Sequence, residues 1–442
     1  MRIPASREPG TARFGASVLL GLSVLGLLAE DATAHGVHDV RFADGAGYSE
    51  TLESLARAID LHQQRVSEDP VSWTPLESLA GAFVNRAHLT GDYSDFARAE
   101  SLYARAFLVA PKGAGPFLAR AQLHFSLHRL DRMEADLRAE ERAIVVLPDV
   151  AHGILALRAE SAALSGEYAK AQTRFDALLA NGRDPGDIAR VASLVWGLGL
   201  QDSSAALWDE AARGCSGCSS QFLAWLAAQQ GDLATERGHF DSAAELYASA
   251  QDRFPGWWFI YERQARLSAL RGDRTAALFA YEELANRTNH PEMMDALAVL
   301  LRESGDAGEA AAAVRWVERA ARLHEARMTR FPEAAIGHGL RHILRFSPDR
   351  ARIVQLAERN RDLRPGGEAR TLLAQAYWRV GRSADARREI ESVLATRWST
   401  PETHATAAVI LGSSPAVASR QRTRAESLSP RAMQLVAWLA PL

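Results

Sequence analysis

The chain has 442 residues and a formal net charge of −3 at pH 7, with its 51 basic and 54 acidic side chains interspersed. It contains no basic block of the kind that a nucleic-acid footprint needs, so we expect no nucleic-acid partner. Hydrophobic residues make up 47% of the chain, which is ample for a folded core. Good helix formers dominate and long runs of Val, Ile and Thr are missing, so we expect almost no sheet.

The segment 1–34 has the pattern of an export signal. Three arginines precede an apolar run from Val18 to Leu28, and Ala32-Thr33-Ala34 forms a small-residue cleavage site. The apolar run is shorter than the ~20 residues that span a membrane. We expect cleavage after Ala34 and a soluble protein in the periplasm or outside the cell, without stable membrane insertion. An uncleaved single anchor is the alternative.

The segment 35–48 has no periodicity and is predicted to be a flexible lead, and helical periodicity then runs from residue 49 to residue 430. Ser49 to Val66 is amphipathic, with Ser49 as the expected N-cap. The next hairpin contains a turn, Gly91 to Arg98, that we expect to be longer than the others. Residues 116–148 form a weaker hairpin without a turn glycine.

The clearest repeat is GHFDSAAELYASAQDRFP, residues 238–255. Ala243 and Tyr247 lie on one helical stripe. Ala277 and Tyr281 repeat this stripe, and each follows its counterpart by the same number of residues. A fixed period of this length indicates stacked helical hairpins.

Two later segments depart from the regular pattern. Gly308 to Arg330 has no helix break, so this helix should project beyond its neighbours or pack across the groove. The tail 431–442 is apolar, and we expect it to cap the last repeat with Leu435 and Trp438, because the end of a repeat stack exposes a face that needs cover.

These patterns resemble the tetratricopeptide repeat family, over roughly residues 50–430. The resemblance implies an all-α fold, an α-solenoid of about nine to ten stacked antiparallel helix hairpins in a TPR-like superhelix. It also implies a concave groove that binds a protein or peptide. The sequence shows no Lys/Asn set like the carboxylate clamp of some members, so a C-terminal peptide is not specially favoured. The residues that carry the resemblance are Gly238, Phe240, Ala243, Tyr247, Ala250 and Pro255, with Ala374, Tyr377, Gly381, Ala386, Ala418, Ala425 and Pro430 in later repeats.

Placing the repeats in register assigns a mixed set of aromatic and charged residues to the inner face of the first helices. Such a mixture suits an extended peptide partner, although for each residue ordinary packing or solvation is the alternative. The predicted groove residues are Trp225, Glu236, Phe259, Glu262, Arg266, Arg302, Gln375, Trp378 and Arg379.

Cys215 and Cys218 are the only cysteines. In an exported protein we expect them to form a structural disulfide with each other. A redox site would require a thioredoxin-like context. Haem attachment would require histidine where Ser219 stands, and zinc would require two more ligands nearby.

Histidines offer an alternative function. His124 and His128, and likewise His338 and His342, are i, i+4 pairs on one helical face, and the mature chain would begin with His35 and His38. These residues are candidate ligands for copper, nickel or zinc. Packed or surface histidines are the plainer interpretation, because two ligands alone make a weak site, so we predict no metal site.

No nucleophile–base or carboxylate constellation is evident. We therefore predict a non-catalytic scaffold that binds a protein or peptide and has no cofactor. The alternative is a periplasmic metal-binding protein.

Overall fold

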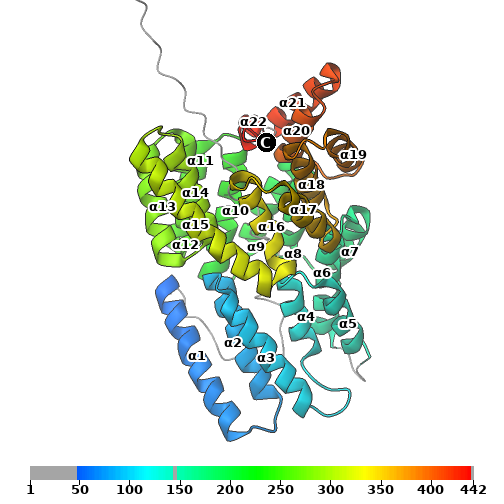
Figure 1. Ribbon diagram of the computed structural model, residues 1–442. Helices are drawn as coiled ribbons and strands as arrows, with labels where there is room; N and C mark the ends of the chain where they lie inside the picture. Colours follow the sequence, from blue (N-terminus) through cyan, green and yellow to red (C-terminus); the bar gives the residue numbers. More distant parts are fainter. Residues whose placement is uncertain (1–46, 143–146, 440–442) are drawn as a thin grey trace, which may run out of the picture.

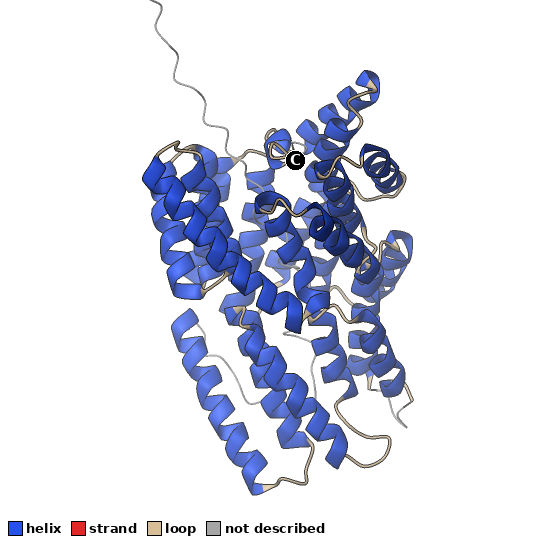
Figure 2. Cartoon of the chain, viewed as in Figure 1, coloured by secondary structure: helices blue, strands red, loops and turns tan. Residues whose placement is uncertain are grey.

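The computed structural model describes residues 47–142 and 147–439, and these residues form helices and no strand (Figures 1 and 2). The predicted all-α class is confirmed. The predicted signal, most of the lead, and His35 and His38 lie outside the described residues. None of the described helices is both long and apolar enough to cross a membrane.

The helices pair into ten successive hairpins, α2 with α3 through α20 with α21, preceded by α1 and followed by α22. Each hairpin packs on the next, so the chain is an α-solenoid with TPR-like helical repeats (Figure 1). The bounds are α1 Tyr48–Glu68, α2 Thr74–Thr90, α3 Tyr93–Val109, α4 Phe117–Ser126, α5 Leu130–Glu140, α6 Pro148–Leu164, α7 Tyr168–Ala180, α8 Pro185–Gly197, α9 Gln201–Gly214, α10 Ser220–Glu236, α11 Phe240–Arg253, α12 Trp258–Arg271, α13 Arg274–Thr288, α14 Pro291–Arg302, α15 Ala307–Arg330, α16 Pro332–Phe346, α17 Arg350–Leu363, α18 Gly367–Arg379, α19 Ser383–Leu394, α20 Pro401–Ile410, α21 Pro415–Leu428 and α22 Ala432–Leu435.

Most hairpin turns place a glycine in the left-handed region, as Gly238 does with φ of 80°. In the hairpin without a turn glycine, His128 adopts φ of 55° between α4 and α5. A non-glycine residue incurs a steric cost there, yet the hairpin still forms. The irregular repeat therefore keeps the turn geometry with a different residue.

Two local expectations were wrong. The N-cap of α1 is Gly47, and Ser49 lies inside the helix. The turn after Gly91 is short, because the Asp92 side chain accepts a hydrogen bond from Ser94 N (2.9 Å) and starts α3 at Tyr93. Aspartate is a preferred N-cap residue, so Asp92 starts α3 directly after Gly91 and the turn is shorter than we predicted.

Helix α15 is 24 residues long and crosses the molecule, as its unbroken pattern predicted (Figure 1). Its C-terminal end reaches the second hairpin helix of the first repeat. The Tyr93 ring lies 5.5 Å from that of Phe331, and the Arg327 guanidinium lies 5.0 Å from the Tyr93 ring. Repeats far apart in the sequence therefore touch.

Successive turns of the superhelix are in contact with each other. Hydrogen bonds join backbone and side-chain atoms of repeats that are far apart in the chain. These bonds are Trp258 Nε1 to Leu89 O (3.0 Å), Tyr48 N to Pro255 O (3.0 Å), Gly367 N to Tyr168 Oη (2.7 Å), Ser399 N to Gly197 O (2.9 Å) and Gln201 Nε2 to Leu428 O (2.8 Å).

This closure buries the first helices of the hairpins on more than one side. In α20, nine of the ten residues are buried, among them Glu402 and Thr406, which face the interior. In an open solenoid this inner face would be the solvent-exposed surface of a groove. Here it meets the opposite wall, so its polar groups must find partners inside the protein.

Candidate functional site

Two of the three aromatic members of the predicted groove are core residues. Trp225 and Phe259 are each only 2% exposed. Trp225 packs edge-on against Trp208 (5.4 Å between centroids), and Phe259 stacks on Trp257 (4.6 Å). Both side chains belong to the packing between hairpins, so assigning them to a partner-binding groove was a mistake. The repeat register does not show which side of the first helix of a hairpin is buried by other parts of the chain.

Several polar members of the predicted groove do face inward, but they bond within the protein. Glu262 is 1% exposed and accepts a hydrogen bond from Tyr281 Oη (3.2 Å), and burial raises its pKa. Gln375 is fully buried. Arg266 donates to Asp232 Oδ1 (2.5 Å). The Glu262 bond lies within one hairpin, and the Arg266 bond joins α12 to α10 of the preceding hairpin. These polar groups therefore have partners inside the protein.

Three further members of the predicted set lie elsewhere. Arg302 is exposed and lies over the Phe346 ring (4.8 Å). Trp378 donates from Nε1 to Leu439 O (3.2 Å), which fixes the C-terminal segment. Arg379 is half-buried, and burial lowers its pKa. The nine predicted positions therefore do not form one continuous surface.

The closed interior contains a cavity of about 220 Å³, which we name the inner cavity. Its lining comes from α6 to α8 and the end of α10 on one side and from α16, α17, α18 and α20 on the other, with Tyr168, Trp196 and Trp398 among the aromatic side chains. This volume lies below the usual range for a drug-sized ligand, so it cannot accept an extended peptide. Of the predicted groove residues, Glu236 lines it, and burial raises the pKa of Glu236 to about 7.

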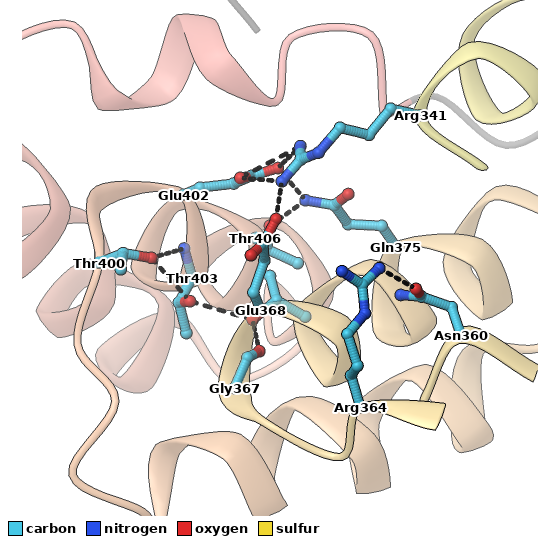
Figure 3. Close-up of polar contacts among 11 residues, drawn as sticks. Arg341, Asn360, Arg364, Gly367, Glu368, Gln375, Thr400, Glu402, Thr403 and Thr406 are labelled. Carbon is cyan, nitrogen blue, oxygen red and sulfur yellow. Dashed lines mark hydrogen bonds and ion pairs between the residues drawn. The ribbon is translucent and has the colours of Figure 1, made fainter. Parts of the chain in front are cut away.

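A polar network occupies one side of the inner cavity (Figure 3). Arg341 donates to Glu402 Oε1 (3.1 Å) and to Glu368 Oε1 (3.0 Å). Gln375 Nε2 donates to the same Glu402 oxygen (3.0 Å) and to Thr406 Oγ1 (2.9 Å). Burial is the largest single influence and acts to raise the pKa of Glu402, but the charge and hydrogen bonds of Arg341, together with the Gln375 hydrogen bond and the Arg345 charge, lower it overall. Arg341 therefore binds two carboxylates in this network.

Arg364, which also lines the inner cavity, has a weaker partner. Its guanidinium donates to the neutral Asn360 Oδ1 (2.8 Å), and no ion pair joins it to a carboxylate among the described residues (Figure 3). Burial lowers the pKa of Arg364. On the same cavity, Trp398 Nε1 is buried without a hydrogen-bond acceptor in the described part of the chain. The cavity therefore favours a small group that is anionic or accepts hydrogen bonds.

A second hollow is larger and open to solvent. It has a volume of about 800 Å³ and lies between α1, α2, α3 and the C-terminal end of α15. Its floor is apolar, with Leu79, Phe83 and Phe331 among the lining side chains. We name it the arginine cleft because four arginines line it: Arg98, Arg105, Arg327 and Arg330.

The arginine cleft has an unbalanced charge. No Asp or Glu is among its lining residues. Arg98 pairs with the buried Asp95 (2.5 Å), and Arg327 pairs with Glu292 (3.4 Å). Arg105 and Arg330 are exposed, and neither has a carboxylate partner among the described residues. The field in the cleft therefore attracts negative charge over an apolar floor.

The predicted histidine pairs do not act as pairs. His124 contacts Asp136 (3.0 Å), whereas His128 lies in the turn beyond α4. On α16, His338 contacts Glu292 (3.3 Å), and His342 turns to a different carboxylate. The two members of each pair therefore separate.

The two cysteines behave as predicted. Cys215 and Cys218 are joined as a disulfide in the loop between α9 and α10, with their Cα atoms 5.3 Å apart.

Sequence reasoning missed the arginine cleft and the carboxylates that the histidines contact. The cleft forms where α15 meets the first repeat, so one side comes from the segment 63–105 and the other from the segment 323–331. Only the unbroken length of α15 pointed to such a crossing.

No family model matches the chain, and no curated protein matches it. Solved structures with a similar course include an IFIT1 monomeric mutant with Gppp-AAAA, at 11% identity and a TM-score of 0.43, covering 85% of this chain and 95% of that one. Human IFIT1 dimers with m7Gppp-AAAA and with PPP-AAAA align at 11% identity, with TM-scores of 0.42 and 0.41, covering 86% of this chain and 95% and 94% of theirs. At this level the likeness concerns the helical-repeat course of the chain alone.

The exclusion of nucleic acid as a partner was wrong. It rested on the absence of a basic block, yet the structural neighbours hold capped or triphosphate ligands. The physical reason is that a chain with dispersed charges can still gather arginines from distant repeats on one surface, as the arginine cleft does.

Proposed function

We propose that this protein is a non-catalytic scaffold that binds an acidic, amphipathic segment of a partner protein in the arginine cleft. The observation that carries the proposal is the lining of that cleft: an apolar floor, four arginines and no carboxylate. This differs from the partner site expected from the repeat register, because the closed superhelix leaves little room along its inner face.

The apolar floor supports a partner with an apolar side. Val66 of α1, Leu79 and Phe83 of α2, and Leu323 of α15 all contribute to it. An amphipathic helix buries such a face by laying it into a groove between helices. The volume of about 800 Å³ suits a short helical segment rather than a whole domain.

The arginines support negative charge on the partner. Arg105 and Arg330 come from the two sides of the cleft, α3 and α15, and both side chains are exposed. A guanidinium can bind a carboxylate with two parallel hydrogen bonds, so acidic residues that flank an apolar stripe would be held on both edges.

The test uses a labelled synthetic helix with leucines on one face and glutamates on the other, and a matched helix with lysines in place of the glutamates. We expect the acidic peptide to bind and its affinity to fall as salt is raised. Reversing two exposed pairs from attraction to repulsion amounts to about 2 kcal/mol, so Arg105→Glu/Arg330→Glu should bind the acidic peptide at least about tenfold more weakly.

Arg420→Glu/Arg422→Glu is the matched control, because it reverses two exposed charges on α21, remote from the cleft (Figure 1). This control should bind like the wild type. Equal binding of the acidic and basic peptides would overturn the proposal. So would an oligoadenylate that binds more tightly than the acidic peptide and loses affinity in the cleft variant, since the cleft would then be a nucleic-acid site.

Export of the scaffold belongs to the same proposal. It is supported by the arginines, apolar run and small-residue site of the segment 1–34. Mass analysis of the protein from an envelope or culture fraction tests it: the mature chain should begin at His35, and an intact N-terminus would contradict cleavage.

A further inference from the structure

Three buried side chains from three consecutive helices converge between the hairpins of α14 to α17. Asp295 of α14, His324 of α15 and His342 of α16 are 7%, 2% and 6% exposed. The Asp295 carboxylate stands between the two rings, with Oδ2 3.0 Å from His324 Nε2 and Oδ1 2.7 Å from His342 Nδ1. One ligand atom from each residue lies within 4.8 Å of the other two.

We propose that Asp295, His324 and His342 form a buried binding site for a divalent transition-metal ion, with Zn²⁺ as the ion of choice. Two imidazole nitrogens and one carboxylate are a ligand set that zinc accepts, leaving a fourth position for water. The site is distinct from the arginine cleft and does not depend on the partner proposed for it.

Without an ion, each ring donates its N–H to a different oxygen of Asp295. Metal binding needs the lone pair of the same nitrogen, so the proton on that nitrogen moves to the other ring nitrogen or leaves to solvent, and the lone pair then binds the ion. In a tetrahedral site the ligand atoms lie about 3.3 Å apart, so rotations of the side chains bring the cluster to metal-binding distance.

The charges around the cluster come from one further carboxylate and two arginines. Glu292 lies one helical turn before Asp295 on α14, and it is within electrostatic range of His324. Glu292 contacts His338 (3.3 Å) and pairs with Arg327 (3.4 Å). Arg345 opposes the ion, because its charge interacts with Asp295. The two carboxylates offset the two arginines, so the affinity for a divalent cation rests on the three ligand atoms themselves.

The sequence points to this site only in part. The pair His338 and His342 was a candidate, but the structure retains only His342 and replaces His338 by His324 from the preceding helix. A pair on one helix offers two ligands, whereas three side chains from three helices fix a geometry that only the folded chain provides.

The experiment uses the full chain, stripped with a chelator and then titrated with Zn²⁺ alone. Calorimetry and elemental analysis should show one tightly held ion, and Co²⁺ in its place should give the visible absorption of a tetrahedral site. His324→Gln and His342→Gln keep an N–H donor for Asp295, so the fold should persist while the affinity falls at least tenfold in each. Circular dichroism of each variant checks that the helices remain.

Two controls separate this site from other histidines. His35→Ala/His38→Ala removes the N-terminal candidates, and His404→Gln changes a buried histidine that bonds to Gln421 (2.6 Å) away from the cluster. Both should retain the ion. The proposal is overturned if the stripped wild type takes up no zinc, or if uptake persists unchanged in both cluster variants. Should a glutamine variant unfold, Asp295→Asn, which is of equal size, must itself lose the ion.

Discussion

At the scale of single residues, buried histidines are the most informative feature of the interior. His290 is 3% exposed, and its ring lies 4.2 Å from that of Trp258, while its Nε2 donates to Thr90 O (3.1 Å). Burial, assisted by the Arg327 charge, lowers its pKa to about 4, although Glu292, the hydrogen bond to Thr90 and Asp92 act in the opposite direction. The folded protein therefore holds this ring neutral.

This makes stability depend on pH. The unfolded chain protonates His290 near pH 6.5 and the folded chain only near pH 4, so between these values the unfolded state binds more protons. The stabilisation is present above about pH 6.5 and is lost as the pH falls towards 4. Because His290→Gln keeps the donor to Thr90 and cannot titrate, its free energy of unfolding should fall by about 2 kcal/mol less than that of the wild type between pH 7 and pH 5.

Urea denaturation at the two pH values measures this difference. His88 and His338, whose pKa values burial also lowers to about 4, are unchanged in the variant and cancel in the comparison. Equal losses of stability in the two proteins would show that His290 is not held neutral by the fold.

At the scale of the elements, α10 and α11 show how the repeat pattern becomes packing. Tyr247, the aromatic residue of the 238–255 motif, is fully buried against Gly231 of the preceding helix. A Cβ at Gly231 would lie 2.5 Å from Tyr247 Cε1. The ring cannot swing away, because its hydroxyl bonds to Asp232 (2.8 Å) and Thr235 (2.9 Å).

Gly231→Ala sets helix propensity against packing. Alanine in a helix is favoured over glycine by about 1 kcal/mol, whereas overpacking a core costs about 1–3 kcal/mol. Because the added Cβ would clash with two ring atoms, we expect packing to prevail and the protein to lose about 1–2 kcal/mol. Thermal or urea unfolding measures this. Gly214→Ala, at the exposed end of α9 where the added Cβ meets an ordinary 3.5 Å contact, should be neutral or stabilising.

The sequence predicted what is local in these elements. The repeat period, the stripe of Ala243 and Tyr247, and the unbroken α15 all follow from side-chain spacing, and each corresponds to an observed helix or hairpin. The prediction of the groove residues was wrong because the solvent exposure of a side chain depends on distant parts of the chain. Trp225 is buried on the side that the register left open. The path of the solenoid is the sum of small rotations between hairpins, and no single repeat encodes that sum.

At the scale of the whole molecule, Trp398 joins the turns of the superhelix. It lies in the loop between α19 and α20, stacked on Tyr168 (5.7 Å between centroids). Glycines make room for it: a Cβ at Gly197 would lie 2.5 Å from its ring and a Cβ at Gly367 would lie 2.1 Å away. One side chain thus contacts α7 and the end of α8, which belong to a much earlier part of the chain.

We expect Trp398→Ala to open the superhelix without melting its helices. Each hairpin keeps its own neighbours, so far-ultraviolet circular dichroism should stay unchanged, while the radius of gyration from small-angle scattering should increase. Removal of a largely buried aromatic side chain should also cost up to about 3 kcal/mol. Phe279→Ala, which removes an aromatic ring that is 70% exposed, is the control and should scatter like the wild type. Unchanged scattering from Trp398→Ala would show that other contacts suffice to hold the turns together.

The contact between successive turns also restricts how such a chain can evolve. An open solenoid tolerates the gain or loss of a hairpin, since every unit meets only its neighbours. Here the circumference is fixed, because Ser399 must arrive at Gly197 and Gly367 at Tyr168. Deleting one hairpin between the partners of these contacts would leave every remaining helix intact. Each of these residues would then face a different residue from the one it now contacts. We therefore expect the number of hairpins per turn of the superhelix to stay constant as the sequence diverges.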